Sequence, residues 1–363
     1  MLTRREFSAS ALAAAGVSLM SLQDGRTAQG LPLVRLANAS GIIDSQVLFL
    51  TMGQHPKLRY YEQEGCVMEI LNMSSAAQAV QSVTSNNCDG APCSPVVFLN
   101  LFAKNPNIDI VFPYIWLRQP YWSVAVKADS PVQKLEDLKG KTIGIRNQGD
   151  TGFVGAKAMY KELGIDPDKD VEWVAVGEGG PAGEAVYKGR VDAMALWDGA
   201  FARMELAGFP LRHLPGTPGT RQLFGNGYCV RKSELGKNRD LFVRCFRAMA
   251  KSTLFSFSNP ELAVRMHWEI YPESKPKGKS DAEALKEALL IVNVRKDKWF
   301  PGSWQTDKRF GGQTKAEWEA QIKFAGLEKE IKDVSGVFTT DLLDDINKFD
   351  REAVIAQAKT MTL

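Results

Sequence analysis

The stretch LKGKTIGIRNQGDTGFVGAKAM, residues 138–159, decides how the fold is read. Its GKT at 140–142 matches the end of a phosphate-binding P-loop, Gly-x-x-x-x-Gly-Lys-[Ser/Thr]. That motif needs a glycine five residues before Gly140, where this chain has Leu135. It also needs a strand before the loop, whereas here the apolar run 142–145 follows it. The order excludes a P-loop and predicts a turn entering a strand, then a loop and a helix.

Strands and helices alternate on both sides of this stretch, at a spacing typical of βαβ units and a mostly parallel sheet. We expect strands at 33–39, 66–71, 108–114, 121–128, 142–146, 171–176, 191–197 and 227–232, and a short strand before Ser94. We expect helices at 43–65, 76–84, 96–104, 152–163, 181–188 and 199–207, and then at 239–256, 260–268, 281–292, 314–324 and 342–358.

The pattern restarts at residue 121, and the similar strands 121–128 and 227–232 predict two crossings between two lobes. The fold class is therefore α/β, two-lobed and hinge-linked, with mostly parallel sheets and a helical C-terminal part. The predicted boundaries place 31–124 and 228–363 in the first lobe and 125–227 in the second. Ligands of such sheets lie beyond the carboxyl ends of the strands, so we expect one cleft between the lobes.

The N-terminus predicts export. Thr3-Arg4-Arg5-Glu6-Phe7 precedes an uncharged, Ala-rich stretch, 9–22, which is typical of a twin-arginine signal peptide. The stretch is shorter than the roughly 20 apolar residues of a membrane-spanning helix. We therefore expect residues 1–30 to be a signal peptide and the rest to be a periplasmic protein.

Composition excludes several classes of function. The chain has 363 residues and a formal net charge of +3, with no Lys/Arg-rich run, so nucleic acid is not an expected partner. Its five cysteines lack a CxxC pair; buried thiols are favoured over a disulfide, for which Cys88–Cys93 is the closest pair. The histidines His55, His213 and His267 are far apart, so neither a zinc site nor any cofactor is expected.

Three elements carry a family resemblance. LEDLKGKTIG at 135–144 resembles a signature of the solute-binding proteins of ABC transporters, in the branch that binds nitrate, taurine, alkanesulfonates and thiamine precursors. LGIDPDKDV at 163–171 and KGRVDA at 188–193 resemble two further elements of that branch, in the same order. The resemblance implies a type II periplasmic binding protein, not an enzyme. It would be a monomer that captures a small molecule by lobe closure and delivers it to permease subunits.

Strand ends and helix starts supply the candidate ligand contacts. Asp150 or Thr151 is placed to cap the helix that follows 147–152, and its free N–H groups favour an anion. Because the Asp150 carboxylate would oppose an anion, the contact is assigned to the backbone and Thr151. Arg118 is placed to bind a carboxylate, and aromatic side chains to hold an apolar ligand body. The predicted ligand-binding residues are Ser40, Gly41, Ser74, Ser75, Ser94, Trp116, Arg118, Tyr121, Asn147, Gln148, Gly149, Thr151, Trp197 and Asp198.

The expected ligand is a small organic anion, an aromatic carboxylate or a sulfonate-like molecule. Two alternatives stay open. Thiamine-pyrimidine synthases share the branch's fold, but they rely on His and Cys clusters, and no histidine is near Cys93 in the sequence. A binding protein that serves a membrane sensor would have the same sequence features.

Overall fold

The computed structural model describes residues 30–363. Apart from Gly30, the predicted signal peptide lies outside the described residues. None of the helices within them combines the length and the apolar character that a membrane crossing requires.

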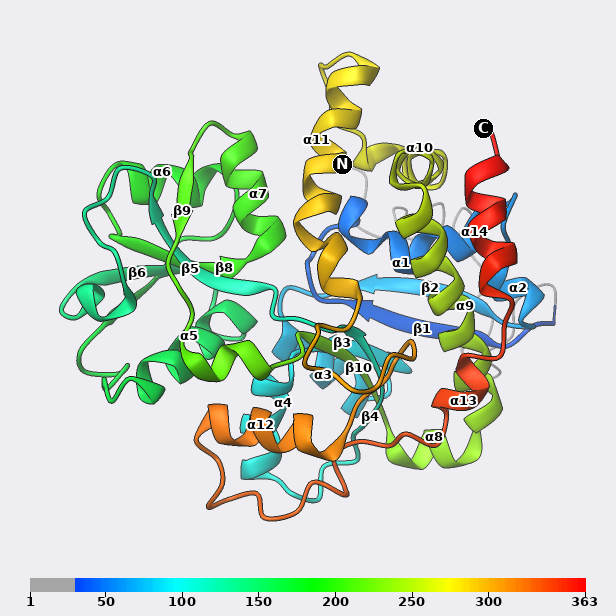
Figure 1. The fold of residues 1–363 in the computed structure, drawn as a ribbon, viewed down its shortest axis with the longest axis horizontal. Coiled ribbons are helices and arrows are strands. Elements are labelled where there is room, and N and C mark those ends of the chain that lie inside the picture. The colour runs from blue at the N-terminus through cyan, green and yellow to red at the C-terminus, as the bar shows by residue number, and fades with distance from the viewer. Residues whose placement is uncertain (1–29) are drawn as a thin grey trace, which may run out of the picture.

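The first lobe is built on a five-stranded sheet in the order β2-β1-β3-β10-β4 (Figure 1). Strands β1, β2 and β3 are parallel, whereas β10 runs antiparallel to both of its neighbours. The strands are β1 (Leu33–Asn38), β2 (Val67–Asn72), β3 (Gly90–Cys93), β4 (Val111–Leu117) and β10 (Asn226–Val230).

The second lobe repeats this plan with the order β7-β6-β8-β5-β9. Strand β6 is parallel to β7 and β8, and β5 is the reversed strand. The strands are β5 (Trp122–Lys127), β6 (Thr142–Ile145), β7 (Glu172–Ala175), β8 (Ala193–Trp197) and β9 (Leu211–His213). The α/β class is confirmed, and both sheets are mixed: in each, one reversed strand makes two antiparallel pairs beside two parallel pairs.

Strands β5 and β10, which look alike in sequence, are the reversed strands of the two sheets. Each comes directly after a crossing of the chain between the lobes. All of β5 pairs within the second sheet, so the boundary expected after residue 124 falls inside that strand. The chain crosses at 118–121 and returns before Asn226, the first residue of β10.

Helices cover both sheets. In the first lobe they are α1 (Leu48–Thr51), α2 (Tyr60–Gln63), α3 (Ala76–Thr84), α4 (Pro95–Lys104), α8 (Lys232–Lys237), α9 (Arg239–Ser258), α10 (Pro260–Ile270), α11 (Asp281–Lys296), α12 (Lys315–Ala325), α13 (Leu343–Ile346) and α14 (Arg351–Thr360). In the second lobe they are α5 (Thr151–Glu162), α6 (Gly180–Tyr187) and α7 (Asp198–Leu206). Helix α11 extends beside the second lobe and faces α7 (Figure 1).

Two helices that the sequence predicted as continuous are interrupted in the structure. The helix expected at 43–65 is broken into short turns because Pro56 disfavours a helical residue before it and Arg59 is left-handed, with φ of 49°. The helix expected at 342–358 stops after Ile346 and restarts when Asp350 caps α14, accepting from the Ala353 N–H at 3.0 Å.

Two strand predictions also need correction. The strand expected at 108–114 begins at Val111 and continues to Leu117. The short strand β9 was not expected; it closes the edge of the second sheet beside β5.

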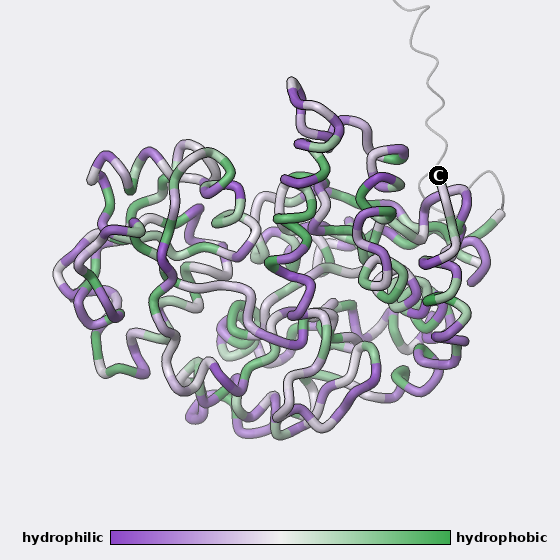
Figure 2. The backbone as a smooth tube through the Cα atoms, turned by 45° about the horizontal axis from the view of Figure 1, so that its top comes forward, coloured by the Kyte–Doolittle hydropathy of each residue, from purple (hydrophilic) through white to green (hydrophobic). Residues whose placement is uncertain are grey.

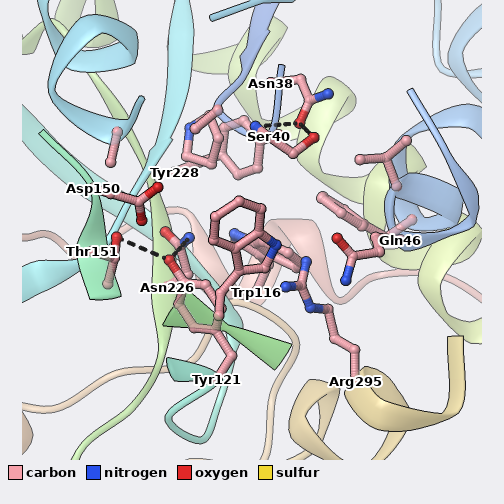
Figure 3. A pocket seen from close by; sticks show the side chains of 16 residues that line it. Asn38, Ser40, Gln46, Trp116, Tyr121, Asp150, Thr151, Asn226, Tyr228 and Arg295 are labelled. Carbon is pink, nitrogen blue, oxygen red and sulfur yellow. Dashed lines mark hydrogen bonds between the residues drawn. The ribbon is translucent and has the colours of Figure 1, made fainter. Parts of the chain in front are cut away.

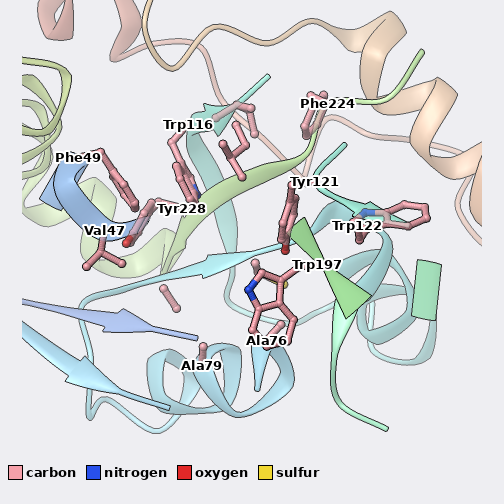
Figure 4. Packing of buried hydrophobic residues seen from close by; sticks show 14 of the residues in the cluster. Val47, Phe49, Ala76, Ala79, Trp116, Tyr121, Trp122, Trp197, Phe224 and Tyr228 are labelled. Carbon is pink, nitrogen blue, oxygen red and sulfur yellow. The ribbon is translucent and has the colours of Figure 1, made fainter. Parts of the chain in front are cut away.

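Hydrophobic positions are spread over both lobes (Figure 2), and aromatic rings gather where the lobes meet (Figure 4). The ring of Trp116 stacks on Phe49 with centroids 3.9 Å apart, and Tyr228 meets Phe49 edge-on. All five cysteines are buried and free, as the composition favoured; Cys88 and Cys93 form no disulfide.

Candidate functional site

A cavity of about 60 Å³ lies between the lobes, at the carboxyl ends of their parallel strands (Figure 3). Both lobes and helix α11 contribute to its wall. The lining residues are Asn38, Ala39, Ser40, Gln46, Val47, Phe49, Ala76, Pro92, Trp116, Tyr121, Asp150, Thr151, Trp197, Asn226, Tyr228 and Arg295.

Five of the predicted ligand-binding residues line this cavity: Ser40, Trp116, Tyr121, Thr151 and Trp197. The other nine do not: Gly41, Ser74, Ser75, Ser94, Arg118, Asn147, Gln148, Gly149 and Asp198.

Several of the residues outside the cavity hold the lobes together instead. Asn147 Nδ2 donates to the Ser74 carbonyl at 3.2 Å, and the Gly149 carbonyl accepts from the Ala77 N–H at 3.3 Å. Gly41 lies against the Arg146 guanidinium, which a side chain at this position would push aside. These residues therefore belong to the contact between the closed lobes.

The remaining serines and Gln148 have ordinary structural positions. Ser75 caps α3, accepting from the Gln78 N–H at 3.2 Å. Ser94 is buried at the start of α4, and Gln148 is exposed.

Arg118 does not reach the cavity. Its guanidinium is buried and donates from Nη2 to Glu317 Oε1 at 3.0 Å, on the first turn of α12. A partner 199 residues away in the sequence gives no local signal, which is why the sequence suggested a ligand contact.

A chain of hydroxyl and amide groups crosses one wall of the cavity. Tyr121 donates to Thr151 Oγ1 at 3.2 Å and accepts from Asn226 Nδ2 at 3.0 Å. These bonds fix the first turn of α5 against the crossing strands, so both lobes contribute to the wall.

Asp150 is the N-cap of α5, accepting from the Gly152 N–H at 3.3 Å, and its carboxylate lines the cavity. Its second oxygen lies 3.6 Å from Arg146 Nη1, beyond hydrogen-bond distance. Burial raises the pKa of Asp150 to about 6, although Arg146 opposes the shift. The helix start therefore presents a carboxylate as well as N–H groups, contrary to the assignment made from the sequence.

Arg295 on α11 is the cation that lines the cavity. Its Nε and Nη2 donate to Asp198, while Nη1 makes no hydrogen bond within the described chain. Lys298 also reaches Asp198, at 3.0 Å. Burial alone would raise the pKa of Asp198, but the two cations overcome it and hold the pKa below its usual value.

Five of the thirteen buried side-chain polar atoms without a partner in residues 30–363 belong to residues of this cavity, and the other eight lie elsewhere. Both side-chain polar atoms of Gln46, the Trp116 Nε1, the Asn226 Oδ1 and the Tyr228 hydroxyl are buried and unpaired. Leaving such a group unpaired costs about 1–3 kcal/mol, so their gathering around one cavity indicates a polar ligand.

The lobes are closed over the cavity. Arg203 of α7 donates to Asp44 of the first lobe at 3.0 Å, and Arg146 donates to the Ser40 carbonyl at 3.1 Å. A Cβ on Gly199 would lie 1.5 Å from Gln46 Nε2, so a side chain there would displace the Gln46 amide from its present position.

The sequence missed Gln46, Asn226, Tyr228 and Arg295. Asn38 was also missed; it is the last residue of β1, whereas the predicted strand ran to residue 39 and selected Ser40 after it. Arg295 sits on a C-terminal helix with no neighbouring motif, so only the tertiary fold reveals it. Metal-ligating side chains form no group that could hold an ion anywhere in the described part of the chain.

Comparisons with known proteins agree with this architecture. The family model described as NMT1/THI5 like matches residues 56–263, more than half of the chain. The alkanesulfonate-binding protein SsuA of Xanthomonas axonopodis pv. citri, bound to MOPS, is similar with a TM-score of 0.59 and 15% identity, over 90% of this chain and 97% of that one. The periplasmic aliphatic sulphonate-binding protein SsuA of Escherichia coli gives a TM-score of 0.59 and 16% identity, over 90% and 99% of the two chains.

A Candida albicans protein with the generic periplasmic binding protein fold gives a TM-score of 0.59 and 16% identity, over 85% of this chain and 97% of that one. The comparison with curated proteins gave no match. At these identities the structural matches show the fold, and the family model shows the family. The chain belongs to the NMT1/THI5-like family and has the two-lobed fold of the periplasmic binding proteins.

Proposed function

We propose that the protein is the extracytoplasmic substrate-binding component of an ABC importer, which captures a small organic acid by closing its lobes. One observation carries the proposal: Arg295, whose Nη1 makes no hydrogen bond within the described chain, lines one cavity with Gln46, Trp116 and Tyr228, which carry unpaired donors. A carboxylate or sulfonate would accept from several of them, and charge-assisted hydrogen bonds are the strong kind.

The cavity favours a compact ligand over an aromatic one. One water needs about 10–15 Å³ of such space, so 60 Å³ corresponds to roughly five water-sized positions. Phe49 stacks on one face of the Trp116 ring, so that face is not available to an aromatic ligand. A short-chain sulfonate or carboxylate fits these limits better than the aromatic carboxylate that the sequence suggested.

The binding role is better supported than the enzyme alternative. Burial raises the pKa of the Cys93 thiol well above its usual value, which disfavours a thiolate nucleophile. Each histidine ring has a partner elsewhere: His55 bonds Glu269, His213 bonds Ser123 and His267 bonds Thr51. Twin-arginine export and delivery to permease subunits are part of the same proposal.

Calorimetric titration of ligand-stripped protein with ethanesulfonate, aminoethanesulfonate, propanoate and β-alanine tests this function. At least one of these acids should bind, and Arg295→Met should weaken its binding by about tenfold or more, because a charged hydrogen bond contributes about 1.5–3 kcal/mol. Arg190→Gln, at an exposed arginine of the second lobe, is the matched control and should bind like the parent. Binding that survives Arg295→Met would contradict the proposed site.

A further inference from the structure

A second cavity, of about 40 Å³, lies within the first lobe and shares Trp116 with the cavity between the lobes. This first-lobe cavity is walled by the end of β4, the start of the crossing at Arg118 and the segment 299–311, with Thr253 of α9 and Arg351 of α14. We propose that it is a separate binding site for one small monovalent inorganic anion, of the size of chloride, held by Arg118 and Trp299.

The Arg118 guanidinium is buried and largely unpaired, with an exposed fraction of 2%. Its Nη2 donates to Glu317 Oε1, whereas Nε and Nη1 are buried without a partner in residues 30–363. The other oxygen of Glu317 accepts from Thr314 at the start of α12. Burial lowers the pKa of Arg118, and the Glu317 charge offsets the shift only in part. A buried cation with unpaired N–H groups calls for a further negative partner.

Trp299 adds a donor to the same cavity. Its ring is buried, and its Nε1 has no partner in the described chain. Guanidinium and indole nitrogens donate hydrogen bonds and accept none. No buried side-chain acceptor among the described residues of this wall is unpaired, so a water molecule would find donors but no free side-chain acceptor for its own hydrogens. An anion, which only accepts, matches this wall better than water does.

The charges around the first-lobe cavity leave one positive charge in excess. Its lining residues include no carboxylate and four cations, which are Arg118, Lys308, Arg309 and Arg351. The carboxylates that pair with these cations from outside the cavity are Glu317, Asp307 and Asp344. Lys308 donates instead to the Gly302 carbonyl at 2.9 Å. Arg351 donates to the neutral Asn347 side chain at 2.8 Å. One monovalent anion would balance the set.

The size and surroundings of the cavity fit a small ion. One water needs about 10–15 Å³ of such space, so 40 Å³ corresponds to roughly three water-sized positions. Tyr114, Phe300 and Phe310 contribute apolar walls, which strengthen the attraction between an anion and Arg118. Lys308 and Arg351 are exposed, so an ion reaches the cavity from solvent on their side.

Urea unfolding of the full chain in sodium chloride and in sodium gluconate, at equal ionic strength, tests the site. Gluconate is too large for the cavity, so the unfolding midpoint should be higher in chloride and should level off as the site fills. Trp299→Phe keeps an aromatic ring and removes the donor. The chloride concentration that gives half of the shift should rise about tenfold in this variant. Trp304→Phe, at an exposed tryptophan of the same segment, should behave like the parent.

Crystals of the parent grown in sodium bromide should show an anomalous scattering peak in contact with Arg118 and Trp299. An equal chloride dependence in the parent and Trp299→Phe would overturn the inference. Ordered water in place of bromide beside Arg118 would overturn it as well. Neither result bears on the proposed function, because the organic acids are assigned to the cavity between the lobes.

Discussion

Asp198, the first residue of α7, and Arg295 of α11 form a buried ion pair that joins the two lobes beside the cavity. Arg295 also lines the cavity. In the proposed function, one arginine would therefore serve both lobe closure and ligand binding. A ligand that contacts Arg295 of the first lobe and Thr151 of the second would bind the closed form better than the open form, which is how binding would favour closure.

Asp198→Asn should destabilise the protein by about 3 kcal/mol, because it leaves two cations, Arg295 and Lys298, without their buried carboxylate. Urea unfolding at neutral pH measures the loss. The control is Glu184→Gln, which breaks an exposed pair with Lys188 on α6 and should leave the free energy of unfolding almost unchanged. Equal losses in the two variants would contradict the importance of the interlobe pair.

Gly199→Ala should weaken ligand binding about tenfold or more while both lobes remain folded. The added methyl group would collide with Gln46 of the opposite lobe, so the collision arises on closure. Calorimetry gives the affinity, and small-angle scattering should show a larger radius of gyration. Gly180→Ala is the control, since a Cβ there meets nothing within 4 Å. A compact, fully binding Gly199→Ala protein would show that closure tolerates the methyl group.

Arg118→Met should separate stability from binding. It leaves Glu317 as a buried carboxylate without its cation, so we expect a loss of about 3 kcal/mol in the free energy of unfolding. Affinity for the ligand should stay within about twofold, because Arg118 lies outside the cavity. Arg295→Met, in contrast, should weaken ligand binding. A loss of affinity in Arg118→Met, at a temperature where it is folded, would restore the role that the sequence suggested.

The strand and helix pattern was readable from the sequence because each βαβ unit is local: α3 begins and ends at the expected residues, 76 and 84. The sequence predicted only some of the residues that line the cavity. Trp197 ends β8 and Thr151 begins the helix after β6, so a rule about strand ends and helix starts finds them. Arg118 and Arg295 are both arginines near the crossings, and which of them meets the ligand depends on partners that are distant in sequence, Glu317 and Asp198.

The Asp150 carboxylate at the start of α5 shows a second limit of prediction from the sequence. The sequence places Asp150 at a helix N-terminus, where an anion is normally favoured, and that reasoning set the residue aside as a ligand contact. The structure buries the side chain in the cavity and raises its pKa to about 6. Burial, which outweighs Arg146 here, depends on the opposite lobe and cannot be inferred from the local sequence.

Asp150→Asn should stabilise the ligand-free protein at neutral pH. The pKa of Asp150 in the folded state is about 6, above the value of about 3.9 expected when unfolded. Between these values the folded protein holds a proton that the unfolded chain has released, so stability falls as the pH rises through this window. The asparagine variant escapes this loss, which amounts to roughly 2–3 kcal/mol above pH 6.

Unfolding in urea from about pH 4 to about pH 7 should therefore show two curves that meet at the acidic end and separate toward neutrality. Superimposed curves at pH 7 would mean that the Asp150 carboxylate is not destabilised by burial. Separated curves would mean that the protein keeps a destabilising carboxylate in the wall of its cavity.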